Sequence, residues 1–384
     1  MYTRDGQDLP VVDADSHVIE PPGAWDRFVS RAYSERVPRL LSEAGTDWLV
    51  VDGEKFFSYA MSGGLARGDQ GFPDANGSAH GRWEECILPG AYDLKQRLAD
   101  MDRDGIDVGI LYPTVGMGLF GLADRALARA LALAHNRWVA ELCSQCPSRL
   151  KGVGIVMPDD AVRAAADIDL CHKLGHVQVL LPLWSGGKDF SDGSWDPIWD
   201  KAASLPMPVG SHAFATGRSR RPARSDSLIE ALVDRTADIE RALVALVFGG
   251  VLDRFEGMRF VSVENEAGWA AGLIDRADVS YLRGRRSVAG LPGCRRLPSE
   301  VFHEQIYFTF IRDQTAIDAR RVIGPANLMW STDYPHNSST WPDSRQRLSS
   351  YLRPELAADE VAAIVGGNAR RLYNVTAPVA VTRP

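Results

Sequence analysis

Short apolar runs alternate along the chain with longer segments in which apolar residues recur every three to four positions. The short runs predict strands and the longer segments predict helices, an alternation typical of a parallel sheet built from βαβ units. The expected strands are Val11–Asp15, Val108–Pro113, Gly152–Met157, Val177–Leu181, Pro208–His212, Arg259–Glu264, Ile306–Phe310 and Asn327–Asp333. Eight strands separated by helices is the number that closes a barrel, so the pattern predicts an α/β fold of the (β/α)8, or TIM-barrel, type.

One stretch, from about residue 40 to about residue 90, interrupts this alternation after the first strand. Within it, residues 48–57 predict a β-hairpin whose turn is Asp52-Gly53, because this dipeptide readily adopts the positive φ angles of a tight turn. Residues 62–81 are rich in glycine and polar side chains, which is typical of a loop. Since the chain shows neither repeats nor linker composition, we expect residues 1–384 to form a single barrel domain with this one insertion.

Composition excludes several classes of protein. A formal net charge of -7 disfavours a general nucleic-acid partner, which would need a basic face to neutralise phosphates. No apolar run reaches the roughly 20 residues of a membrane helix, and the polar N-terminus does not resemble a signal peptide, so we expect a cytoplasmic protein. The five cysteines are scattered, and the C-x-x-C pair Cys143 and Cys146 lacks a second pair at zinc-site spacing, so free thiols are expected.

Polar residues that can bind metal fall at the ends of four of the predicted strands. Asp15 and His17 end the first strand, and their spacing of two places both side chains on one face. His212 ends the fifth strand, Glu264 the sixth and Asp333 the eighth. Because catalytic groups of TIM barrels gather at the carboxyl ends of the strands, we expect these five residues to meet at one rim and hold a cation.

Each of these residues alone has a simpler interpretation. Asp15 or Asp333 alone would more often be a helix N-cap, and Glu264 could pair with an arginine. Two further residues share the favourable rim: Glu20, as a metal ligand or as an acceptor for a ligating histidine, and His336, as a proton-transfer group. The other histidines fall on helices, in the insertion or at the opposite end of the predicted barrel, where packing or surface roles prevail.

Several motifs resemble those of the amidohydrolase-related family, which includes the aminocarboxymuconate-semialdehyde and resorcylate decarboxylases. They are V-D-A-D-S-H-V-I-E-P at residues 12–21, S-T-D-Y-P-H at 331–336 and G-N-A at 367–369. The resemblance implies a TIM barrel with a metal at the strand ends, and hydrolysis or non-oxidative decarboxylation. His17, His212 and Asp333 match the family's ligand positions.

The chain departs from this family at two ligand positions. Asp15 stands where the first histidine of a His-x-His motif is usual, and Glu264 stands where the sixth strand usually supplies histidine. Exchanging two imidazoles for carboxylates makes a harder site, which favours iron or manganese over zinc and can neutralise two divalent ions. In this respect the chain resembles dinuclear non-haem iron monooxygenases of actinobacterial natural-product pathways, so two iron ions are expected, with zinc or manganese as the alternative.

Two activities therefore remain open. The first is O2-dependent hydroxylation of a bulky apolar substrate, with Asp333, Glu264 and His336 as catalytic residues. The alternative is metal-dependent hydrolysis or non-oxidative decarboxylation of a carboxylic acid or ester, in which Asp333 is both ligand and general base.

A local basic run follows His212 and gives the one indication of the substrate. Arg218, Arg220 and Arg221 lie on the expected catalytic side and could bind the phosphates of a coenzyme A thioester, although a solvated loop explains them as well. We therefore expect a small-molecule substrate and no nucleic-acid or membrane partner, and a homodimer remains open.

Overall fold

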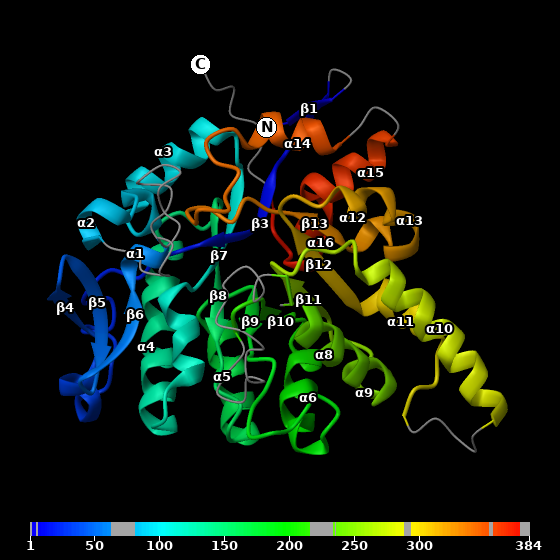
Figure 1. The fold of residues 1–384 in the computed structure, drawn as a ribbon, viewed down its shortest axis with the longest axis horizontal. Coiled ribbons are helices and arrows are strands. Elements are labelled where there is room, and N and C mark those ends of the chain that lie inside the picture. The colour runs from blue at the N-terminus through cyan, green and yellow to red at the C-terminus, as the bar shows by residue number, and fades with distance from the viewer. Residues whose placement is uncertain are drawn as a thin grey trace.

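Eight parallel strands surround the centre of the molecule in their order along the chain (Figure 1). The computed structural model describes residues 2–4, 7–62, 81–215, 233–234, 236–287, 293–352 and 356–376. The barrel strands are β3 (Val12–His17), β7 (Val108–Tyr112), β8 (Leu150–Ile155), β9 (Gln178–Leu180), β10 (Val209–His212), β11 (Phe260–Val263), β12 (Ile306–Phe310) and β13 (Leu328–Trp330). Their positions confirm the predicted TIM barrel.

The barrel closes where the segment after β13 meets β3. The amide of Asp333 donates to the Asp15 carbonyl at 3.0 Å, and the amide of His17 donates to the Tyr334 carbonyl at 2.7 Å. The buried carboxylate of Asp13 accepts a hydrogen bond from the Thr332 amide at 2.8 Å. Closure therefore joins the first and last strands at the level of the predicted ligands.

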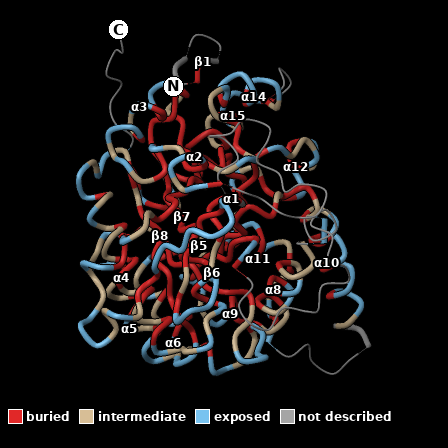
Figure 2. Tube along the Cα trace, turned by 60° about the vertical axis from the view of Figure 1, so that its left-hand side comes forward, coloured by how far each residue is buried: buried red, intermediate tan, exposed pale blue. Residues whose placement is uncertain are grey.

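Helices cover the outside of the barrel, and their outer faces are exposed while the strands inside them are buried (Figure 2). The longer helices are α3 (Leu94–Asp104), α4 (Arg125–Ser144), α5 (Ala161–Lys173), α6 (Asp196–Ser204), α8 (Thr236–Phe248), α10 (Ala270–Ser287), α11 (Pro298–Gln305) and α14 (Ser344–Tyr351). Shorter turns are α1 (Tyr59–Ser62), α2 (Trp83–Cys86), α9 (Val251–Arg254), α12 (Gln314–Asp318), α13 (Arg320–Ile323), α15 (Ala358–Ala362) and α16 (Asn368–Leu372). Among the described residues, no helix is both long and apolar enough to cross a membrane.

Aspartates fix where several of these helices begin. Asp93 accepts a hydrogen bond from the Gln96 amide, and Asp124 and Asp160 each accept from two amides of the first turn of α4 and of α5. Such N-caps satisfy amides that have no partner within the helix. Both ends of α3 are thereby defined, because Gly105 terminates the helix with a left-handed φ of 78°.

The insertion after β3 forms a small antiparallel sheet at the side of the barrel (Figure 1). Its strands are β4 (Arg39–Glu43), β5 (Thr46–Val51) and β6 (Glu54–Ser58). The hairpin between β5 and β6 turns at Asp52 and Gly53, whose φ angles of 53° and 82° confirm the predicted turn. The strand β4 was not predicted, because all its residues are exposed and its sequence shows no alternation.

His176 lies buried just before β9, where its Nε2–H donates to the Asn136 carbonyl at 2.9 Å. Burial lowers the pKa of His176 from 6.5 to about 4, so the folded protein keeps this imidazole neutral. Between these two pH values the unfolded chain binds a proton that the folded chain does not. The contribution of His176 to stability is therefore complete above pH 6.5 and falls by about 3 kcal/mol as the pH drops to about 4.

The variant His176→Gln tests this pH dependence. Its free energy of unfolding, measured by urea denaturation between pH 7 and pH 4, is expected to fall less steeply than that of the wild type. Equal slopes for the two proteins would show that the folded chain protonates His176 as readily as the unfolded chain.

Candidate metal centre

Local backbone geometry brings the predicted ligands to the rim. The pairing of β3 with β7 shifts register between Asp13 and Ser16, a β-bulge of the kind that redirects side chains near functional sites. Glu264 and Asp333 follow their strands with left-handed φ angles of 54° and 56°. This conformation costs a non-glycine residue roughly 1–3 kcal/mol, and such strain is concentrated at functional positions.

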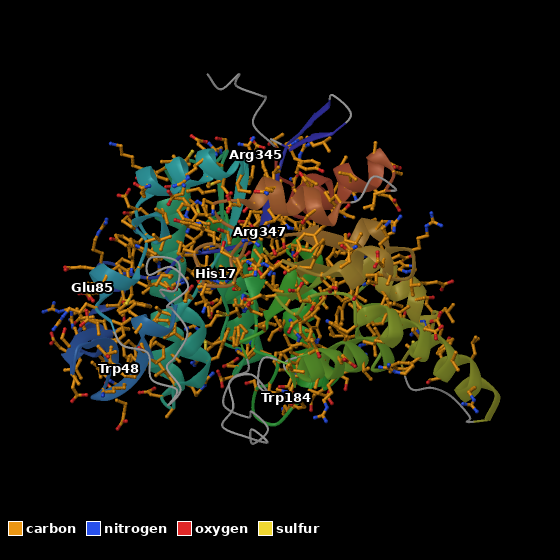
Figure 3. All side chains as sticks on the ribbon, turned by 45° about the horizontal axis from the view of Figure 1, so that its top comes forward. His17, Trp48, Glu85, Trp184, Arg345 and Arg347 are labelled. Atoms are coloured by element: carbon orange, nitrogen blue, oxygen red, sulfur yellow. The ribbon has the colours of Figure 1, made fainter. Side chains whose placement is uncertain are left out.

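The side chains of six residues meet in a buried cluster near the middle of the molecule, where Figure 3 labels His17. They form two overlapping groups, each with ligand atoms within 4.8 Å of one another: Asp15, His17, His212 and Glu264 in the first, and His17, Glu264, Asp333 and His336 in the second. His17 and Glu264 belong to both groups. The structure thus brings together the five residues predicted from strand ends, and His336 with them.

The Nε2 atom of His17 lies at the centre of this cluster. It is 3.3 Å from Asp15 Oδ1, 3.5 Å from Asp333 Oδ1 and 3.2 Å from His212 Nε2. The other ring nitrogen of His17, Nδ1, lies 3.1 Å from the Pro113 carbonyl, which can only accept a hydrogen bond. The proton of a neutral His17 is therefore on Nδ1, and the Nε2 lone pair faces the neighbouring carboxylates, as in a metal-ligating histidine.

The remaining members are held by short contacts. His212 Nε2 lies 3.0 Å from Glu264 Oε2. His336 Nδ1–H donates to Asp333 Oδ1 at 2.7 Å, and the Ser338 hydroxyl donates to the other oxygen of Asp333. By contrast, Asp15 Oδ1 is buried and receives no hydrogen bond from the described residues.

Electrostatics favour a cation in this cluster. Burial, together with the charges of Glu264 and Asp333, holds the pKa of Asp15 well above its usual range, against the opposing effect of His212. Burial holds the pKa of His17 well below its usual range, so His17 is neutral and able to bind metal. A divalent ion would offset the repulsion between the carboxylates, so the donor set fits such an ion.

His336 and Asp333 form a charged pair on the more open side of the cluster. Burial alone would lower the pKa of His336, but Asp333 outweighs it and raises that pKa to about 9. In turn, His336 outweighs burial at Asp333 and lowers the pKa of this carboxyl to about 2. The Nε2 atom of His336 lies 3.0 Å from the Thr114 hydroxyl, and the side chain is 15% exposed. It is thus the most exposed side chain of the cluster.

Glu20 does not join the cluster. Its two carboxylate oxygens accept hydrogen bonds from the amides of Val115 and Gly116, at 2.8 and 3.0 Å, and from His135 Nε2 at 2.8 Å. Glu20 therefore fixes the 3-10 turn at Val115–Gly121, and we leave it out of the proposed ligand set. His135, interpreted from sequence as a helix packing residue, is fully buried as the partner of Glu20.

Besides the Ser338 hydroxyl, sequence reasoning missed two hydroxyl groups that contact the ligands. Thr309 accepts from the Glu264 amide at 2.8 Å and donates to Asp15 Oδ2 at 3.4 Å, while Thr114 lies 3.4 Å from His17 Nδ1. Thr309 lies near the end of β12 and Thr114 just beyond the end of β7, so the rule that identified the ligands would have found them had it been applied to hydroxyl residues.

Some predictions about the substrate concern other parts of the chain. Arg218, Arg220 and Arg221 lie outside the described residues. An apolar substrate would need aromatic side chains around the cluster, but in Figure 3 Trp48 is labelled at the lower left and Trp184 near the lower edge, both apart from His17. These two tryptophans therefore give no support to a bulky apolar substrate.

Comparison with known proteins identifies the family. A family model described as amidohydrolase matches residues 79–375, which include His212, Glu264 and Asp333. The chain belongs to the amidohydrolase family. This amidohydrolase is 26% identical over 271 residues to a gamma-resorcylate decarboxylase of Polaromonas sp. (strain JS666), a match that covers 63% of this chain and 79% of the relative.

Solved structures of similar proteins share the fold of this amidohydrolase. An amidohydrolase of Mycobacterium avium subsp. paratuberculosis K-10 superposes with a TM-score of 0.74 at 20% identity, covering 96% of this chain and 99% of the other. A 5-carboxyvanillate decarboxylase of Novosphingobium aromaticivorans, complexed with manganese and 4-hydroxy-3-methoxy-5-nitrobenzoic acid, superposes with a TM-score of 0.69 at 19% identity, covering 97% and 98%. The family match and the similarity to the gamma-resorcylate decarboxylase favour the hydrolase or decarboxylase alternative and give no support to the monooxygenase interpretation.

Proposed function

We propose that this amidohydrolase is a divalent-metal enzyme that removes CO2 from a small aromatic carboxylic acid without net oxidation. The observation that carries the proposal is the buried cluster in which the His17 lone pair faces carboxylates that repel one another. The decarboxylases among its relatives, one of them with manganese bound, supply the reaction class. The oxygen-rich donor set suits manganese or iron better than zinc.

The residues that would hold the ion are Asp15, His17, His212, Glu264 and Asp333. A bound divalent ion would supply positive charge for the substrate's carboxylate and for a neighbouring ring oxygen. Because the cluster is buried, these attractions would act with little screening by water. The protein thereby orients the carboxyl group relative to His336.

His336 is the proposed proton donor. In the reaction, the bond between the ring carbon and the carboxylate carbon breaks, its electron pair stays on the ring, and CO2 leaves. The ring carbon then takes the proton from His336 Nε2, while Asp333 holds the opposite nitrogen at 2.7 Å and stabilises the imidazolium before transfer. Water returns a proton to the imidazole, so the reaction needs neither oxidant nor reductant.

A second candidate function is O2-dependent hydroxylation at a dinuclear iron site. The specific observation in its favour is that two ligand groups overlap at His17 and Glu264, an arrangement in which one carboxylate could bridge two ions. Arg218, Arg220 and Arg221 remain predicted phosphate contacts for a coenzyme A thioester under either function.

One assay separates the two candidates. The enzyme, stripped with a chelator and reloaded with Mn2+ or Fe2+, would be incubated with hydroxybenzoic acids with and without O2. We expect CO2 release that depends on the metal and proceeds at the same rate anaerobically. Consumption of O2 with a hydroxylated product, and no CO2 from any acid tested, would contradict the decarboxylase proposal in favour of the second candidate.

A further inference from the structure

Arg97, on helix α3, lies buried beside the strand that carries Asp15 and His17. Only 4% of this residue is exposed. Its Nε donates to the Gly90 carbonyl at 2.6 Å, one terminal nitrogen donates to the Ser16 hydroxyl at 2.9 Å, and the other donates to the His17 carbonyl. The guanidinium also stacks over the Tyr334 ring, 4.6 Å from its centroid. One side chain therefore contacts two of the four segments that bear proposed metal ligands, the one with His17 and the one with Asp333.

The acceptors of Arg97 are unusual for a buried cation. The three hydrogen bonds end on two backbone carbonyls and one hydroxyl, while the charges of Asp13 and Asp100 act on the guanidinium without a hydrogen bond to it among the described residues. Burying a cation that no carboxylate pairs directly is costly, and an apolar side chain of similar volume would often be cheaper. A gain in the stability of the whole fold therefore does not explain why an arginine is present here. The contacts of Arg97 with His17 and Tyr334 suggest that it acts locally, on these two segments.

Those contacts hold the backbone of His17 from both sides. The His17 amide donates to the Tyr334 carbonyl at 2.7 Å, while its carbonyl accepts from Arg97. Tyr334 directly follows Asp333, and its hydroxyl donates to Asp100, one turn after Arg97 on α3. A Cβ at Gly90 would collide with both Asp100 and the Tyr334 hydroxyl, so this region is closely packed.

We propose that Arg97 is a positioning residue that sets the separation of His17 and Asp333, and so determines how tightly the centre binds a divalent ion. This inference rests on the proposed metal centre. His17 and Asp333 lie on strands at opposite ends of the sheet order, which meet only at the closure of the barrel. Arg97 and the ring of Tyr334 stabilise that closure, and neither contributes a ligand atom to the proposed metal centre. Outer groups of this kind typically change metal affinity by about 10–100-fold when removed.

The test compares Arg97→Met with a matched control, Arg129→Met. Arg129 is a partly buried arginine on α4 that pairs with Asp167 on α5 at 2.6 Å, away from the cluster. Titration of each metal-free protein with Mn2+, followed by electron paramagnetic resonance of the free ion, would give the Kd, and thermal unfolding would give the Tm. We expect Arg97→Met to raise the Kd by about 10–100-fold and Arg129→Met to change it by less than about twofold, whatever the shift in Tm of each variant.

A spectroscopic measurement distinguishes positioning from general destabilisation. At saturating Co2+, the visible absorption of Arg97→Met is expected to differ from that of the wild type, because the ligand separation has changed, whereas the control spectrum is unchanged. If Arg97→Met does not fold, Arg97→Lys serves instead, because lysine keeps the positive charge but cannot make all three hydrogen bonds of the arginine. A raised Kd is again expected for this variant.

A folded Arg97 variant with the wild-type Kd and Co2+ spectrum would overturn the inference while the proposed function stands. Failure of the wild type to bind Mn2+ or Co2+ would instead overturn the metal centre itself, and the role of Arg97 with it.

Discussion

Replacing His17 with glutamine is expected to abolish both metal binding and activity. His17 belongs to both ligand groups, and its Nε2 faces Asp15 and Asp333 at 3.3 and 3.5 Å. Without this shared imidazole, the metal ion loses a ligand that belongs to both groups. We therefore expect kcat/KM to fall at least about 1000-fold, which corresponds to a loss of about 4 kcal/mol of transition-state stabilisation. Elemental analysis of the purified variant by mass spectrometry should find almost no bound divalent metal.

The matched control for this variant is His172→Gln, at an exposed histidine in the last turn of α5. It makes the same chemical change far from the cluster, so the metal content and kcat/KM of the wild type should be retained. A His17→Gln protein with the metal content of this control would show that His17 is not a ligand.

Replacing His336 with glutamine is expected to lower kcat by about 100- to 10,000-fold, the range for loss of a general acid. Metal content should stay at the wild-type value, because the first ligand group does not include His336. Single-turnover measurements of CO2 release, with metal analysis of the same sample, would test this. Loss of one of two bound ions would identify His336 instead as a ligand of a second ion, as the dinuclear candidate requires.

The barrel, and the convergence of five proposed ligands at its rim, could be predicted because each follows from a local pattern. Buried parallel strands are short continuous apolar runs, so β10 and β11 were evident, and the rule that side chains converge at the strand ends placed His212 and Glu264 together. Strand β4 escaped prediction because its pairing with β5 depends on turn geometry rather than on burial.

The role of Glu20 could not be predicted from such local patterns. It lies three residues after His17, yet its carboxylate points to amides at Val115 and Gly116 and to His135, some hundred residues further along the chain. Arg97 is a similar case, because two of its three acceptors are backbone carbonyls, which leave no pattern in the sequence. Contacts of this kind depend on how distant segments pack, which periodicity does not encode.

The class of reaction could also not be predicted from the types of metal ligand. Exchanging imidazole for carboxylate at Asp15 and Glu264 ranks manganese and iron above zinc, but the same ions serve hydrolysis, decarboxylation and O2 activation. The prediction of a di-iron monooxygenase rested on this metal preference and on a resemblance, and ligand types alone do not justify the step from metal to reaction. The similarity to decarboxylases now favours the non-oxidative alternative.

The central claim, that side chains from four strands hold a divalent ion at one rim of the barrel, is tested most directly by crystallography at the manganese absorption edge. Crystals of the active, Mn2+-loaded enzyme are expected to give a strong anomalous peak in contact with His17 Nε2, the carboxylate of Asp15 and Asp333. A fully active crystal form with no anomalous peak at this cluster would contradict the account.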